Sequence, residues 1–83
     1  MYEIVTSDKA KKQLNKFPQD FLCRINSVFE RIKINPFHHI KRKEGTKYFI
    51  LRVGEHRIIL DIKNDKKIIY IIELGHRKDI YKK

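Results

Sequence analysis

The chain has 83 residues, a length that suits one domain, residues 1–83, with a thin hydrophobic core. Hydrophobic residues are 41% of the total, which excludes a disordered composition, and twenty Lys and Arg against ten Asp and Glu give a net charge of +10. This charge favours an anionic partner, although a coding bias toward lysine would raise it without one. No apolar run approaches the roughly 18 residues of a membrane span, and the only cysteine, Cys23, excludes an internal disulfide. We therefore expect a soluble cytoplasmic protein with no membrane partner.

The N-terminal half predicts one strand and two helices. Residues 2–6 alternate as in a short strand, and Ser7 can cap the helix that follows. Pro18 ends this helix and can open the next, because a proline lacks the N–H that the first helical turn does not need. Hydrophobic residues then recur with the helical period over residues 21–32, and Asn35-Pro36 stops the second helix. We expect the two helices to form a hairpin.

A basic segment, residues 37–47, follows the second helix. Its adjacent histidines, His38 and His39, predict no metal site, because neighbouring histidines rarely reach one ion and no Cys or carboxylate stands at ligand spacing. We expect a solvated loop here, and neither a metal nor another cofactor in the protein. Four basic residues of the segment are candidates for contact with RNA: Lys41, Arg42, Lys43 and Lys47. Simple solvation is the alternative for each of them.

The C-terminal half is rich in Ile, Tyr and Phe and predicts three strands. They lie at residues 48–53, 56–63 and 67–74. Their connections, at Gly54-Glu55 and around Asn64-Asp65, are short enough for hairpins, so the strands should form an antiparallel meander. With the helices on one face, this is an α+β domain of order β-α-α-β-β-β with a short C-terminal turn or helix. Which edge of the sheet receives the N-terminal strand stays open.

Two arginines should face each other across the first hairpin. If Gly54-Glu55 is a two-residue turn, Arg52 lies opposite Arg57 and both side chains point to one face. Like charges directly opposite each other cost stability, and a bound anion would turn the repulsion into a clamp for phosphate oxygens. Two alternatives stay open: both side chains splay into water, or a carboxylate such as Glu73 or Asp61 neutralises them. A three-residue loop would separate the pair.

The end of the last strand should meet this arginine pair. An even-numbered second turn would put Arg57 beside Ile72, so that His76 and Arg77 emerge near the same end of the sheet. Tyr81 follows Arg77 by four residues and can reach back if the segment forms a helical turn. The predicted site therefore holds Arg52, Arg57, His76, Arg77 and Tyr81.

The stretch "KRKEGTKYFILRVGEHRIILDI", followed by "IIELGHRKDIY", resembles the RelE/ParE superfamily of toxins from toxin–antitoxin pairs. The resemblance covers nearly the whole chain and implies a compact α+β domain like that of small microbial ribonucleases. It implies one of two activities: members of the RelE branch cleave mRNA in the ribosomal A site without a metal, whereas members of the ParE branch poison DNA gyrase and largely lack the nuclease residues. Both are neutralised by a small antitoxin, so the implied partners are a cognate antitoxin and, for a nuclease, the ribosome and mRNA.

The resemblance assigns roles residue by residue. Arg57 matches the hairpin arginine of the family, which contacts the scissile phosphate. Arg77 matches the arginine after the last strand, which is implicated in transition-state stabilisation and protonation of the leaving group. Tyr81 matches the C-terminal tyrosine, which stacks on or activates the substrate nucleotide.

One position departs from the family pattern. Arg52 matches the second of two basic residues that are usual on its strand, and Ile50 stands where the first would be. His76 aligns where many relatives have histidine or lysine. A RelE-type nuclease is the first hypothesis; a non-catalytic, ParE-like gyrase inhibitor and an inactive relative that only binds its antitoxin are the alternatives.

Overall fold

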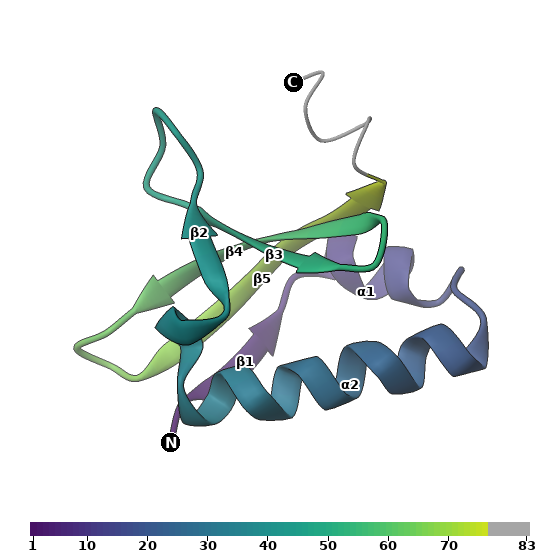
Figure 1. Cartoon of the computed structure of the whole chain (residues 1–83), viewed down its shortest axis with the longest axis horizontal. Helices are drawn as coiled ribbons and strands as arrows, with labels where there is room; N and C mark the ends of the chain where they lie inside the picture. Colours follow the sequence, from purple (N-terminus) through teal and green to yellow (C-terminus); the bar gives the residue numbers. More distant parts are fainter. Residues whose placement is uncertain (77–83) are drawn as a thin grey trace.

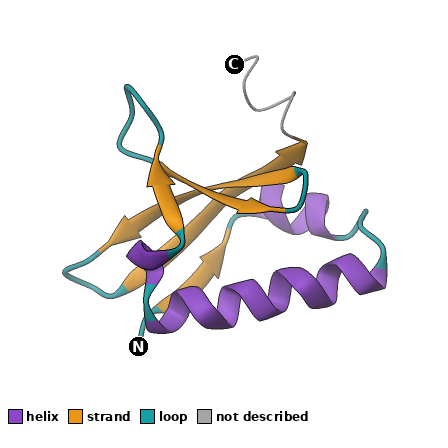
Figure 2. Ribbon diagram, in the orientation of Figure 1, coloured by secondary structure: helices purple, strands orange, loops and turns teal. Residues whose placement is uncertain are grey.

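The computed structural model describes residues 1–76 and has a five-stranded sheet with two helices packed on one face (Figures 1 and 2). Its elements are β1 (Glu3–Thr6), α1 (Asp8–Leu14), α2 (Gln19–Ile34), the 3-10 helix η1 (Pro36–His38), β2 (Ile40–Arg42), β3 (Phe49–Val53), β4 (His56–Lys63) and β5 (Ile68–His76). The predicted α+β class, with a strand, a helical pair and an antiparallel sheet in that order, is confirmed.

Local signals set the two helices. The Ser7 side chain accepts a hydrogen bond from the Ala10 N–H at 3.1 Å, which confirms the predicted N-cap of α1. Pro18 occupies the N-cap of α2 in an extended conformation, and α2 ends at Ile34, before Asn35. Both helices therefore begin where the sequence pattern predicts, but α1 ends at Leu14 rather than at Pro18.

The sheet has the order β1-β5-β4-β3-β2, and β1 runs parallel to β5. The N-terminal strand therefore pairs with β5 at one edge of the sheet. The sequence alone did not indicate which edge it would join. The other edge strand, β2, lies in the segment that we expected to be a loop, and that expectation was wrong. Lys43 donates its N–H to the Tyr48 carbonyl at 2.9 Å and closes a hairpin that pairs β2 with β3. β2 has three residues and polar neighbours, which is too short for an alternation of apolar and polar residues to be recognised in the sequence.

The second hairpin is longer than the turn that we predicted. Lys63 pairs with Ile68, so four residues connect β4 and β5, and a register shift leaves Ile72 as an extra residue on β5. Arg57 consequently lies opposite Gly75, and the prediction that it lies beside Ile72 was wrong. Arg57 therefore lies opposite the residue that directly precedes His76 on β5.

The core lies between the sheet and the helices. Its fully enclosed side chains come from both layers: Ala10, Ile25, Ile32, Leu51, Val53, Ile58, Leu60, Ile69, Ile71 and Leu74. On β3 and β4 these residues alternate with Arg52 and Arg57, which therefore belong to the opposite face. Within residues 1–76, no helix is both long and apolar enough to cross a membrane.

Gly54 sets the geometry of the first hairpin. Its φ is +62°, and a Cβ at this position would lie 3.4 Å from Nη1 of Arg24. Gly54→Ala should lower the free energy of unfolding by about 1–2 kcal/mol, because an L side chain disfavours the left-handed region. Urea denaturation measures this loss. Gly45→Ala, at φ +75° with nothing within 4 Å, should cost a similar amount, and a neutral Gly54→Ala would contradict the observed turn.

Candidate nucleic-acid interface

The β3–β4 hairpin brings two arginines into direct opposition. The register pairs Arg52 with Arg57 and Val53 with His56, which confirms the predicted two-residue turn. Both guanidinium groups therefore leave the sheet on the face opposite the helices. This face is the candidate nucleic-acid interface, because two adjacent arginines can contact one phosphate with several hydrogen bonds.

The two arginines differ in their surroundings. Arg57 is 7% exposed and has Ile59, which is 3% exposed, two residues further along β4 on the same face. Arg52 is exposed. Enclosure restricts the rotamers of Arg57, so its charge is held in place before an anion arrives, whereas Arg52 keeps the freedom to adjust.

The carboxylates that could neutralise the arginine pair each contact a lysine. Glu73 Oε2 lies 2.7 Å from Lys9 Nζ, and Asp61 Oδ2 lies 3.4 Å from Lys63 Nζ. Among residues 1–76, the ion pairs that involve a carboxylate do not include Arg52. The geometry therefore leaves Arg52 available to an external anion.

The structure gives the position of one of the three C-terminal site residues. The backbone of His76 ends β5 opposite His56, one residue beyond the Gly75–Arg57 pair. Arg77 and Tyr81 lie outside the described residues, so their predicted places in the site stay predictions. The end of β5 and the arginine pair lie at the same end of the sheet, next to the β3–β4 turn (Figure 1).

The four basic residues of the predicted RNA-binding segment do not share one face. Lys41 is exposed and pairs with Ile50, so it lies on the face of Arg52. Arg42 pairs with Phe49, a residue packed against the core, and therefore lies on the other face. The remaining two, Lys43 and Lys47, belong to the β2–β3 hairpin, where Lys47 Nζ lies 5.7 Å from the ring centroid of Tyr48. Only part of the basic segment can therefore extend the arginine face.

His56, which precedes Arg57, was not among the predicted site residues. Its ring packs at 5.1 Å from Phe17 and at 4.6 Å from Phe21, measured between ring centroids. These contacts anchor the start of β4 to the helical pair and thus support the arginine next in the chain. The sequence indicated this position of His56 only through the predicted two-residue turn, which pairs it with the core residue Val53.

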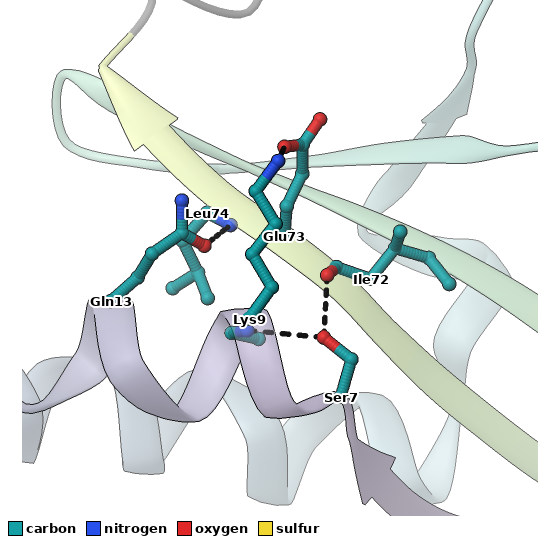
Figure 3. A network of polar contacts seen from close by, with 7 residues as sticks. Ser7, Lys9, Gln13, Ile72, Glu73 and Leu74 are labelled. Carbon is teal, nitrogen blue, oxygen red and sulfur yellow. Dashed lines mark hydrogen bonds and ion pairs between the residues drawn. The ribbon is translucent and has the colours of Figure 1, made fainter.

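A second feature that we did not predict is a set of polar contacts between α1 and β5 (Figure 3). β1 pairs with β5 only as far as Ile71, and α1 side chains continue along the strand edge. Ser7 donates its hydroxyl hydrogen to the Ile72 carbonyl at 2.6 Å, and Gln13 Oε1 accepts the Leu74 N–H at 2.7 Å. These bonds satisfy backbone groups that no neighbouring strand reaches, and they fix the end of β5 that leads into the site.

The arrangement is suited to binding an anion through arginine. In the part of the chain that the structure describes, no cluster of three or more His, Cys, Asp or Glu side chains could hold a metal ion. The arginines stay charged at any physiological pH, so they can stabilise a phosphate and additional negative charge on it.

Comparison with known proteins gives a family match along most of the chain. The family model described as the ParE toxin of type II toxin–antitoxin systems, parDE, matches residues 4–81. A search of curated proteins finds no match.

Several solved structures are similar in fold. A chain of the toxin–antitoxin complex RelBE2 from Mycobacterium tuberculosis is 24% identical, with a TM-score of 0.81, over 92% of this chain and 98% of that chain. A chain of the RelB–RelE antitoxin–toxin complex from Methanococcus jannaschii is 26% identical, with a TM-score of 0.73, over 93% and 94%. The isolated RelE toxin from E. coli is 14% identical, with a TM-score of 0.76, over 99% and 93%.

Proposed function

The chain belongs to the ParE toxin family of type II toxin–antitoxin systems, within the RelE/ParE superfamily, and we propose that among the activities of this superfamily it has that of a ribosome-dependent endoribonuclease. The proposed reaction is metal-independent cleavage of mRNA in the ribosomal A site, which stops translation. The observation that carries it is the cross-strand pair of Arg52 and Arg57 on the face away from the helices. Two opposed arginines repel each other and destabilise the fold when no anion is bound. A phosphate bound between them would offset this repulsion.

The proposed chemistry needs three tasks: removal of the 2′-hydroxyl proton, stabilisation of charge on phosphorus, and protonation of the leaving 5′-oxygen. Arg57, held by its enclosure, and Arg52 beside it would bind the scissile phosphate. Arg77 would stabilise the transition state or the leaving group. Tyr81, with His76 as second candidate, would orient or activate the 2′-hydroxyl, since cations nearby lower the pKa of a phenol and an imidazole titrates near neutrality.

The partners of the proposed nuclease are a cognate antitoxin, the ribosome and mRNA. Two of the similar solved structures are toxin–antitoxin complexes, which supports the antitoxin as a partner of this chain. Lys41, on the same face as the arginine pair, would add an RNA contact. Arg42, on the other face, and Lys43 and Lys47, in the β2–β3 hairpin, would contact ribosomal RNA away from that face.

Inhibition of DNA gyrase is the second candidate function. Two observations favour it: the matching family model is that of ParE toxins, and Ile50 replaces a basic residue that is usual in the nucleases. In this reading the basic face would bind a protein target without catalysis.

Two assays with the purified protein separate these functions. We expect the protein to arrest in vitro translation at a concentration at which it leaves the supercoiling activity of DNA gyrase unchanged. The reverse result, gyrase inhibition with normal translation, would replace the nuclease by the ParE-like function.

A further inference from the structure

Arg24 lies against the turn of the β3–β4 hairpin. It is an exposed residue of α2, and its guanidinium group reaches Gly54. A Cβ at Gly54 would lie 3.4 Å from Nη1, 3.8 Å from Cζ and 3.9 Å from Nη2 of Arg24. Because these three distances are similar, the guanidinium group lies alongside the turn rather than touching it with one atom. A glycine in the turn, which has no side chain, allows this close approach.

The side-chain donors of Arg24 have no partner among residues 1–76. Asp20 lies four residues earlier on α2, a spacing at which a carboxylate and an arginine can pair, but its Oδ1 accepts the N–H of Phe21 at 3.1 Å. The ion pairs of the described residues do not include Arg24, and none of their hydrogen bonds uses its guanidinium group. A guanidinium group whose five N–H donors are unused can bind an external anion.

Arg52 lies next to the same turn, on the other side of the sheet. It is exposed and stands on β3 two residues before Gly54, which is about 7 Å of extended chain. Its side chain belongs to the face away from the helices, whereas Arg24 extends from the helical layer. The two arginines therefore flank the hairpin turn, at the end of the sheet where β5 also ends (Figure 1).

We infer that Arg24 and Arg52 bind two phosphates of one single-stranded RNA that passes over the β3–β4 turn. Each guanidinium group donates hydrogen bonds to one phosphate, so the RNA path continues from the sheet face to the helical layer. This inference rests on the proposed function, because it takes RNA as the ligand of the face that carries Arg52. It adds a contact from α2, an element that supplies none of the predicted site residues.

Binding of a short single-stranded RNA tests the inference. The probe is an oligonucleotide that is 2′-O-methylated throughout, so that the 2′-oxygen cannot attack and only binding is measured, by fluorescence anisotropy at several salt concentrations. Arg24→Met removes the charge but keeps a long side chain against the turn, and it should bind about three- to tenfold more weakly than the control Arg31→Met. Arg31 is exposed on the same side of α2, two helical turns further on, so the control removes an equal charge.

The salt dependence of binding distinguishes a phosphate contact from a loss of total charge. One phosphate contact with a single strand contributes about 0.7 to the slope of log K against log salt concentration, so Arg24→Met should reduce the slope by about that amount. Arg31→Met should leave the slope unchanged, and so should Arg24→Lys, which keeps the charge. Arg52→Met should reduce the slope as Arg24→Met does, and the double variant Arg24→Met/Arg52→Met should reduce it about twice as much.

Three results would overturn the inference: equal binding by Arg24→Met and Arg31→Met, an unchanged slope for Arg24→Met, or no binding of the oligonucleotide by the unmodified protein. The outcome is independent of cleavage, because a protein that binds the oligonucleotide through Arg24 but does not cleave mRNA on ribosomes would remove the nuclease proposal and keep this site. Arg24 is exposed, so its replacement should change stability little, and urea denaturation of each variant checks that the fold is retained.

Discussion

Arg57→Ala should lower the rate of mRNA cleavage on ribosomes by about 100-fold or more, because it removes a preorganised donor from the place where charge develops on phosphorus. Arg57 is 7% exposed and lies opposite Arg52, so water cannot readily replace its guanidinium group. The measurement is a single-turnover cleavage rate with programmed ribosomes. An unchanged rate would show that the arginine pair is not the phosphate site.

Two further variants separate the loss of chemistry from a loss of folding. Arg57→Lys keeps the charge but not the planar, bidentate donor, and should retain a rate between those of the wild-type protein and Arg57→Ala. Arg31→Ala removes an arginine from an exposed position on α2 and should cleave at the normal rate. A similar loss in Arg31→Ala would mean that total charge, rather than the arginine pair, determines activity.

Ile71→Ala should produce the largest loss of stability, about 2–5 kcal/mol in the free energy of unfolding. Ile71 is 0% exposed and lies on β5, where β1 and β4 pair with it on both sides. Removing three side-chain carbons there leaves a cavity between the sheet and the helices. A domain of this size has little stability in reserve, so the variant should be partly unfolded near physiological temperature.

Ile34→Ala is the matched control for this substitution. The same three carbons are removed from a residue that is 72% exposed at the end of α2, so urea denaturation should show a change within about 0.5 kcal/mol. Equal losses in the two variants would contradict the described core.

The sequence predicted those features that depend on a few neighbouring residues. Ser7 starts α1 through a side-chain hydrogen bond, Pro18 starts α2 through its restricted backbone, and Gly54 defines a two-residue hairpin through its positive φ. The opposition of Arg52 and Arg57 follows directly from that turn, so the arginine half of the candidate site could be predicted from the sequence.

The features that were missed depend on residues far apart in the chain. Ile72, the extra residue on β5, directly follows the last residue of β5 that pairs with β1. Its carbonyl accepts a hydrogen bond from the Ser7 hydroxyl instead of from a strand. Alternation along β5 alone cannot show such a shift, so the predicted partner of Arg57 was wrong by three residues. The Lys9–Glu73 pair joins positions 64 residues apart, and no local pattern indicates it.

Mapping of mRNA 5′ ends after in vitro translation with the purified protein tests the central claim most directly. The proposed nuclease predicts new 5′ ends within codons that occupy the A site, which appear with the wild-type protein and are strongly reduced with Arg57→Ala. Arrested translation without new 5′ ends would contradict ribosome-dependent cleavage, and so would equal amounts of cleavage by the two proteins.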